Sequence, residues 1–223
     1  MKNDTIKRMT EPGLLPVIRL DSGDKLPELL EALMRGGVTA AELTMTMPDA
    51  PRLLSENKKR FAGALSLGMG TVTDAASARA ALEAGAEFLV SPFPVFEALR
   101  LAQAACVPMV MGAFSPSEVY QAWKAGADFV KIFPLNVAGI GYLKDIRGPL
   151  PGVKLFPTGG ITLENVSEVI EAGAVGCGVG GALVKKGLIA AGKWDELAAL
   201  AKRFVDAVRG ARARVASKED GGK

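Results

Sequence analysis

Short apolar stretches alternate along the chain with longer segments whose apolar residues recur at helical spacing. Apolar, β-branched stretches of this length, bounded by glycine and proline, predict buried strands. The predicted strands span residues 14–20, 38–45, 64–67, 87–90, 107–111, 128–134, 153–156 and 174–179. The predicted helices span residues 26–33, 48–63, 73–84, 94–105, 115–126, 138–146, 162–170 and 195–209, with Ser115 and Thr162 as helix caps.

This alternation of strand and helix predicts parallel strands joined by right-handed crossovers. Eight such units close into a (β/α)8 TIM barrel, and a chain of 223 residues suits one domain of this kind. A doubly wound open sheet is the alternative, but it does not ordinarily need eight units. We expect a polar N-terminal segment over 1–13, the barrel domain over 14–210 and a disordered C-terminal tail over 211–223.

The strand at 128–134 carries one lysine, Lys131, between apolar neighbours on both sides. Burial of an ammonium without a partner is costly and lowers its pKa. One interpretation is that Lys131 extends to solvent or pairs with a carboxylate. The other is that it points into a closed interior, where a neutral amine can attack a ketone and form a Schiff base.

Composition narrows the chemistry further, because the chain contains no histidine. This excludes Ser-His-Asp and Cys-His nucleophiles, imidazole zinc sites and histidine acid–base catalysis. Cys106 and Cys177 are isolated thiols, which we interpret as reduced core residues rather than a disulfide or a metal pair.

Charge and hydropathy indicate no nucleic-acid or membrane partner, and we expect a cytoplasmic protein. The net charge is +3 with scattered basic residues, so no nucleic-acid surface is expected. The C-terminal arginines Arg209, Arg212 and Arg214 are interpreted as a solvated helix end. The sequence shows neither a signal peptide nor an apolar run of about 18 residues, so we expect no membrane segment.

Several candidate site residues lie at the predicted C-terminal ends of the strands, where barrel enzymes carry their active sites. They are Arg19, Glu42, Thr44, Thr71, Ser91, Pro92, Lys131 and Phe133. Strand alternation places Glu42 with Thr44, and Lys131 with Phe133, on shared faces. Glu42 is either a structural ion-pair partner of Lys131 or Arg19, or a general acid/base beside the lysine.

Glycine pairs follow the last two predicted strands, as Gly159-Gly160 after Thr158 and as Gly180-Gly181. Turns need glycine in any case. Two pairs in these strands, each leading to a helix, also predict a phosphate-binding cup built from backbone N–H groups.

These motifs resemble the 2-keto-3-deoxy-6-phosphogluconate (KDPG) and 4-hydroxy-2-oxoglutarate aldolases over roughly residues 14–208. The matching runs are Glu42-Leu43-Thr44, Gly68-Met69-Gly70-Thr71-Val72, Val90-Ser91-Pro92, Val130-Lys131-Ile132-Phe133-Pro134 and Pro157-Thr158-Gly159-Gly160-Ile161. The resemblance implies a homotrimer of TIM barrels that needs no metal or cofactor and cleaves a 2-keto acid into pyruvate and an aldehyde.

The resemblance also implies residue roles. Lys131 matches the Schiff-base lysine and Glu42 the proton-shuttling glutamate. Substrate-binding residues would be Arg19, Thr44, Thr71, Pro92 and Phe133, and phosphate-binding residues would be Thr158, Gly159, Gly160, Gly180 and Gly181.

The chain departs from the family pattern at the anion-binding positions. Met45-Thr46-Met47 stands where many members have an arginine, and Gly181 stands where many have a serine. An aldolase of a non-phosphorylated 2-keto acid is therefore an alternative. Two further alternatives are a phosphate-binding isomerase or decarboxylase, and a non-catalytic or engineered barrel that serves as an assembly subunit.

Overall fold

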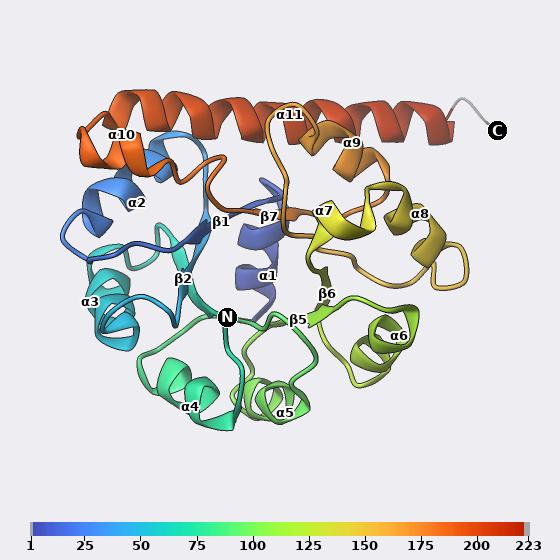
Figure 1. The fold of residues 1–223 in the computed structure, drawn as a ribbon, viewed down its shortest axis with the longest axis horizontal. Coiled ribbons are helices and arrows are strands. Elements are labelled where there is room, and N and C mark those ends of the chain that lie inside the picture. The colour runs from blue at the N-terminus through green and yellow to red at the C-terminus, as the bar shows by residue number, and fades with distance from the viewer. Residues whose placement is uncertain (1, 221–223) are drawn as a thin grey trace.

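The computed structural model describes residues 2–220, with side chains described up to residue 217. Within those residues, seven parallel strands form one curled sheet in the order β6-β5-β4-β3-β2-β1-β7, with helices around it (Figure 1). The strands are β1 (Leu14–Ile18), β2 (Ala40–Thr44), β3 (Ser66–Gly70), β4 (Leu89–Val90), β5 (Met109–Ala113), β6 (Phe129–Ile132) and β7 (Cys177–Val179).

An eighth extended segment closes the sheet between β6 and β7. Leu155 bridges to Val130, and Thr158 bridges to Gly178, both in parallel register. The Phe156 N–H donates to the Val130 carbonyl at 2.8 Å. Pro157 has no amide hydrogen, so the ladder is interrupted there. The predicted strand at 153–156 thus takes its place in the barrel, and the predicted TIM-barrel class is confirmed.

The helices alternate with the strands, and those after α1 lie around the outside of the barrel. They are α1 (Lys2–Thr10), α2 (Leu26–Arg35), α3 (Ala50–Arg60), α4 (Ala75–Glu83), α5 (Phe96–Ala104), α6 (Pro116–Lys124), α7 (Leu135–Ala138), α8 (Gly141–Arg147), α9 (Val166–Glu171), α10 (Lys186–Ala190) and α11 (Trp194–Asp220). Ser115 caps α6 as predicted and accepts the Glu118 N–H at 3.3 Å. The predicted Thr162 cap is wrong, because α9 begins only at Val166.

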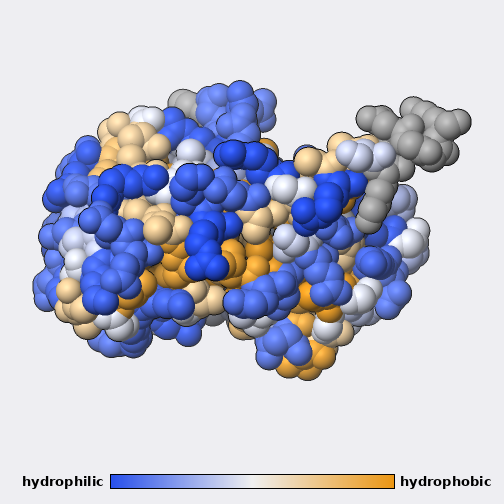
Figure 2. All heavy atoms as spheres, turned by 90° about the horizontal axis from the view of Figure 1, so that it is seen from above, coloured by the Kyte–Doolittle hydropathy of each residue, from blue (hydrophilic) through white to orange (hydrophobic). Residues whose placement is uncertain are grey.

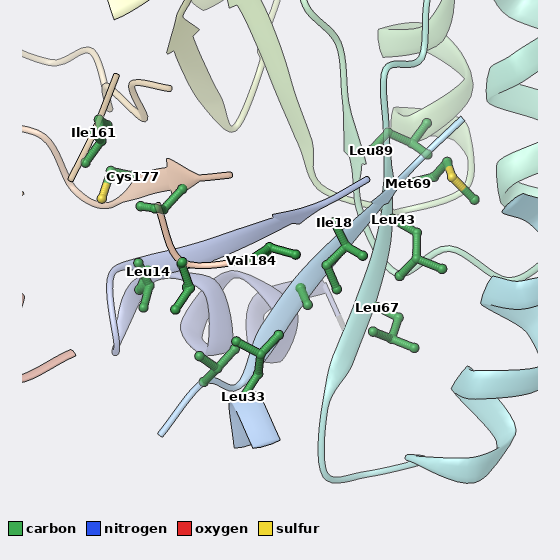
Figure 3. Close-up of a cluster of buried hydrophobic side chains, with 14 of the residues drawn as sticks. Leu14, Ile18, Leu33, Leu43, Leu67, Met69, Leu89, Ile161, Cys177 and Val184 are labelled. Atoms are coloured by element: carbon green, nitrogen blue, oxygen red, sulfur yellow. The ribbon is translucent and has the colours of Figure 1, made fainter. Parts of the chain in front are cut away.

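The core has two parts, one inside the barrel and one between the strands and the helices. The inner part is Met9, Leu15, Ala40, Phe88, Val90, Val110, Phe129 and Phe156. Met9 belongs to α1, which lies in the centre of the view in Figure 1. The outer part includes Leu14, Ile18, Leu33, Leu43 and Leu67 (Figure 3). Because α1 contributes to the inner core, the polar segment predicted at the N-terminus is a packed helix.

The C-terminal helix corrects two predictions. The structure continues α11 to Asp220, so residues 211–220 do not form the predicted disordered tail, and residues 221–223 lie outside the described residues. Ala211 is fully buried. Arg212 donates to three backbone carbonyls, so it does not belong to a solvated helix end. Hydrophilic side chains cover much of the surface seen from above α11, with smaller hydrophobic areas among them (Figure 2).

The two cysteines differ in their surroundings. Cys177 is buried as predicted, and burial raises the pKa of its thiol to about 12. Cys106 is exposed, with φ of 54° at the turn after α5, so its predicted core position is wrong. The small residues around Cys106 indicated burial, but they belong to a tight turn at the surface. Among residues 2–220, no helix is long and apolar enough to cross a membrane.

Candidate active site

Lys131 lies in the third position of β6, inside the barrel. Its side chain is only 6% exposed, and in the sheet it is paired with Gly112 of β5. Its Nζ lies 4.9 Å from the centre of the Phe133 ring. Burial lowers the pKa of Lys131 below its ordinary value; the Glu42 charge opposes this shift and the Arg19 charge adds to it. A lowered pKa increases the neutral fraction of the amine, which is the nucleophilic form.

Glu42 lies in the middle of β2 and is 2% exposed. Its carboxylate occupies the space beside Gly70 of β3, where a Cβ atom would overlap Oε1. Burial raises the pKa of Glu42, while the charges of Lys131 and Arg19 lower it. These opposite shifts are the arrangement expected of a nucleophile and an acid/base that share a site.

No ion pair within 4 Å joins Glu42 to Lys131 or Arg19 among the residues with described side chains. The structural ion pair, which was one interpretation of Glu42, is therefore not present. The three charges still influence one another through the interior, as their pKa shifts indicate. Such a separation leaves room for a substrate or a water molecule between the amine and the acid.

Two loop residues stand near this pair at the ends of β3 and β4. Thr71 has φ of 58°, a left-handed conformation that is unfavourable for a β-branched residue. Strained backbone of this kind often occurs at functional sites. Pro92 packs its backbone against Gly112, the sheet partner of Lys131, at a distance that no Cβ would allow. Gly112 therefore brings the end of β4 close to the lysine strand.

Thr44 is fully buried at the end of β2. Its hydroxyl donates to the Ile18 carbonyl at 3.2 Å and shares a hydrogen bond of 2.9 Å with the Thr46 hydroxyl. These bonds join the ends of β1 and β2. The Thr44 hydroxyl is thus already engaged in hydrogen bonds within the chain.

A cavity of about 700 Å³ opens at the ends of β1, β6 and β7. Its wall contains seven of the predicted site residues: Arg19, Phe133, Thr158, Gly159, Gly160, Gly180 and Gly181. Phe133 connects the two halves of the site, because its ring lines the cavity and also lies over Lys131. The cavity therefore extends from Phe133, whose ring lies next to Lys131, to the glycine turns.

The glycine pairs Gly159-Gly160 and Gly180-Gly181 lie in turns, and no helix begins directly after either pair. Gly159 and Gly160 have φ of 104° and 68°, which only glycine adopts readily. The Asn165 side chain donates to the Gly160 carbonyl at 2.9 Å and accepts the Thr162 N–H at 2.9 Å. Because α9 begins at Val166 and α10 at Lys186, the helix N-termini expected directly after the glycine pairs are not present there.

Sequence reasoning missed seven residues of the cavity wall, namely Val17, Ile161, Thr162, Gly178, Ala182, Val184 and Lys186. The six uncharged ones lie within two or three residues of predicted site residues along the chain. Lys186 could have been noticed as a cation shortly after the Gly180-Gly181 pair. Among the described residues, no group of three or more Cys, Asp or Glu side chains is arranged to hold a metal ion.

Comparisons with known proteins agree with this geometry. Residues 5–200 match the family model described as KDPG and KHG aldolase. A 2-dehydro-3-deoxy-phosphogluconate aldolase of Pseudomonas aeruginosa is 34% identical over 207 residues, 91% of this chain and 91% of that protein. A KHG/KDPG aldolase of Escherichia coli K12 is 30% identical over 202 residues, 90% of this chain and 94% of that protein.

A solved structure extends the agreement to the fold. The KDPG aldolase of Legionella pneumophila, with pyruvate captured as a covalent carbinolamine intermediate, superimposes with a TM-score of 0.83. Its sequence is 30% identical, and the alignment covers 88% of this chain and 96% of that chain. On the family match, these identities and this coverage, the chain belongs to the KDPG and KHG aldolase family.

Proposed function

We propose that this chain is a class I aldolase that uses Lys131 as its Schiff-base nucleophile and Glu42 as its proton carrier. The substrate is 2-keto-3-deoxy-6-phosphogluconate, cleaved to pyruvate and glyceraldehyde 3-phosphate, or 4-hydroxy-2-oxoglutarate, cleaved to pyruvate and glyoxylate. The observation that carries the proposal is the buried pair itself: an amine whose pKa is lowered on β6 and a carboxyl whose pKa is raised on β2.

The reaction begins when the neutral Lys131 amine attacks the C2 ketone of the substrate. The neutral Glu42 carboxyl protonates the hydroxyl of the resulting carbinolamine, so that water leaves and a protonated imine and the Glu42 carboxylate remain. The Glu42 carboxylate then takes the proton of the C4 hydroxyl, the C3–C4 bond breaks, and its electron pair moves to the imine nitrogen to give an enamine. The aldehyde leaves, C3 of the enamine takes a proton back from Glu42, and water releases pyruvate and the free lysine.

The remaining predicted residues would hold the substrate at both ends. Arg19 and Thr71, with Pro92 beside them, would bind the C1 carboxylate. Phe133 would pack against the carbon chain, between Lys131 and the cavity. Thr44 would contribute indirectly, because its hydroxyl is hydrogen-bonded to the Ile18 carbonyl and the Thr46 hydroxyl.

The distal end of the substrate would occupy the cavity between the two glycine turns. Thr158, Gly159, Gly160, Gly180 and Gly181 all line that cavity, which supports their role in binding phosphate. Gly181 offers no side-chain hydroxyl, and this favours the smaller 4-hydroxy-2-oxoglutarate or a non-phosphorylated 2-keto acid as the alternative. Steady-state cleavage of KDPG, its galacto epimer and 4-hydroxy-2-oxoglutarate would rank them by kcat/KM.

Borohydride trapping tests the lysine chemistry directly. Incubation with pyruvate and borohydride should reduce the imine and leave a stable adduct on Lys131, located by peptide mass spectrometry. Lys131→Ala should give no adduct, whereas Lys124→Ala, which removes an exposed lysine of α6, should label fully. Turnover without an adduct would instead support an isomerase or decarboxylase with Lys131 as an electrostatic group. An unlabelled protein without turnover would support a non-catalytic assembly subunit.

We also propose that the protein is a cytoplasmic homotrimer. Four aromatic side chains, Phe93, Phe114, Tyr120 and Trp123, are 39–48% exposed. Clusters of exposed apolar side chains commonly mark contacts between subunits. A phosphorylated sugar acid is multiply charged and does not cross membranes unaided, which favours an enzyme inside the cell.

A further inference from the structure

One positively charged side chain in the wall of the cavity, that of Lys186, has a role that the fold does not explain. The cavity wall has two positively charged side chains, Arg19 and Lys186, and no carboxylate among the described residues that line it. A cavity lined in this way attracts anions. The proposed substrate is anionic at both ends, so we assign each of the two positively charged side chains to one end of it.

Arg19 belongs to the reactive end of the cavity. Its charge lowers the pKa of both Glu42 and Lys131, so the guanidinium acts on the same space as the catalytic pair. Lys186 shows no such influence on either group. It begins α10, beyond the turn formed by Gly180 and Gly181, and so belongs to the distal end.

The ion pair that Lys186 forms is too weak to explain its presence as a structural feature. Its Nζ lies 2.9 and 3.1 Å from the two carboxylate oxygens of Asp21. The Lys186 and Asp21 side chains are 66% and 89% exposed. Exposed ion pairs contribute little to stability, so this pair can open at little cost when a stronger anion binds.

The neighbouring glycines leave room for that anion. A Cβ at Gly180 or Gly181 would meet open space rather than another atom. A tetrahedral oxyanion can therefore approach the backbone of the turn, and the missing hydroxyl at position 181 leaves one of its oxygens without a partner from the turn. An ammonium is a stronger partner for a dianion than a hydroxyl is.

We propose that Lys186 binds the distal phosphate of the substrate and is the residue that selects phosphorylated over non-phosphorylated 2-keto acids. This inference rests on the proposed function for the identity of the substrate, but binding can be measured without turnover. In the free protein Asp21 holds the ammonium at the cavity edge, and in the complex the phosphate replaces Asp21.

A matched pair of unreactive sugar acids tests the proposal by calorimetry on the full chain. The two ligands are 6-phosphogluconate and gluconate, which differ only in the phosphate. Lys186→Ala should weaken 6-phosphogluconate binding about 10–30-fold, as expected for loss of one charge-assisted contact, and change gluconate binding less than about twofold. Lys186→Arg should recover most of the lost affinity. Lys185→Ala removes an adjacent exposed lysine outside the cavity wall and should leave both affinities unchanged.

A second variant tests the exchange of partners. Asp21→Asn removes the competing carboxylate and should tighten 6-phosphogluconate binding roughly two- to threefold, within the range of an exposed ion pair. Equal affinities of the wild type and Lys186→Ala for 6-phosphogluconate would overturn the proposal, and so would an equal loss for both ligands. Pyruvate trapping on Lys131 in the same samples reports separately on the proposed aldolase chemistry.

Discussion

Glu42 is the residue whose chemistry the structure defines most sharply, because it is buried close to Lys131 without an ion pair. Its neutral form accumulates more readily than that of a surface glutamate, since burial raises its pKa. A carboxyl of this kind can both accept and return a proton near neutral pH. Gly70 keeps the space for it open.

Replacement of Glu42 by glutamine should separate imine formation from carbon–carbon cleavage. Glu42→Gln retains shape but cannot accept the C4 hydroxyl proton, so kcat for cleavage should fall about 10²–10⁴-fold. Borohydride trapping with pyruvate should still label Lys131. Glu83→Gln, an exposed substitution on α4, is the control and should retain full activity. Full cleavage by Glu42→Gln would contradict the proposed role.

The lowered pKa of Lys131 predicts the pH dependence of imine formation. Only the neutral amine attacks, so the initial trapping rate should rise with pH, with a midpoint below the ordinary lysine value of 10.5. The Glu42 charge favours the protonated ammonium. Glu42→Gln should therefore move the midpoint to still lower pH. Initial rates of pyruvate trapping between about pH 6 and pH 10 test both shifts, and a midpoint at or above 10.5 would show that the amine is solvated.

Individual residues of the site could be predicted from sequence where a charged residue interrupts a short apolar strand. An isolated lysine between apolar neighbours predicts burial, and Lys131 is buried. The position of Lys186 could not be predicted in the same way. An exposed lysine at the start of a short helix is common, and only the cavity wall distinguishes this one from its neighbour Lys185.

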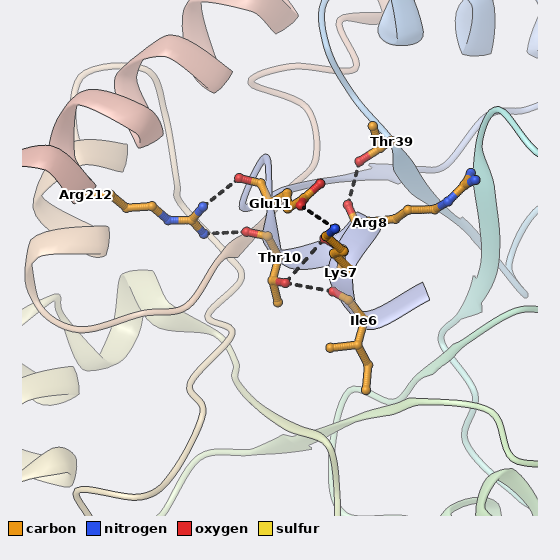
Figure 4. A network of polar contacts seen from close by, with 7 residues as sticks. All are labelled: Ile6, Lys7, Arg8, Thr10, Glu11, Thr39 and Arg212. Atoms are coloured by element: carbon orange, nitrogen blue, oxygen red, sulfur yellow. Dashed lines mark hydrogen bonds and ion pairs between the residues drawn. The ribbon is translucent and has the colours of Figure 1, made fainter. Parts of the chain in front are cut away.

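At the scale of elements, Arg212 ties three separate parts of the chain together. It extends from α11 and donates to the carbonyls of Glu11, Thr10 and Val175 at 2.6–2.7 Å. Figure 4 shows two of these bonds where α1 ends. One guanidinium thus fixes the exit of α1 and the approach to β7, near the point where the barrel closes.

Loss of this contact should destabilise the whole barrel. Arg212→Ala leaves three carbonyls without their charged donor, so the free energy of unfolding should fall by about 2–3 kcal/mol. Urea unfolding followed by circular dichroism measures the change. Arg209→Ala removes an exposed arginine from the same helix and should change stability by less than about 0.5 kcal/mol. Equal stabilities of the two variants would show that Arg212 is dispensable.

The elements that the sequence did not predict share a physical cause, which is that tertiary contacts define them. α1 is polar in sequence, but its Met9 fills the inner core. β3 extends to Gly70, beyond its predicted end at 67, because Phe88 and Glu42 occupy the space beside Gly68 and Gly70. A local sequence pattern identifies the apolar residues that pack against a sheet. It does not show that a glycine belongs to a strand because a side chain from another element fills the space beside it.

For the whole molecule, the distribution of side chains around the barrel mouth suggests how copies associate. The cavity lies at the ends of β1, β6 and β7. The exposed aromatic residues lie on other segments: Phe93 follows β4, Phe114 follows β5, and Tyr120 and Trp123 lie on α6. None of these aromatic residues lines the cavity, so a subunit contact through them would leave the glycine turns and Lys186 available to substrate.

Disruption of the aromatic surface should dissociate the proposed trimer. Light scattering after size-exclusion chromatography should give the wild type a mass of three times the 23.2 kDa of the chain. Tyr120→Glu replaces a 44% exposed ring on α6 with a charge, and burial of that charge in every contact should shift the mass toward the monomer. Ala216→Glu, an exposed change on α11, is the control and should stay trimeric. If the wild type itself has the mass of one chain, the aromatic surface faces solvent and the trimer proposal is wrong; if Tyr120→Glu stays trimeric, subunits meet elsewhere on the barrel.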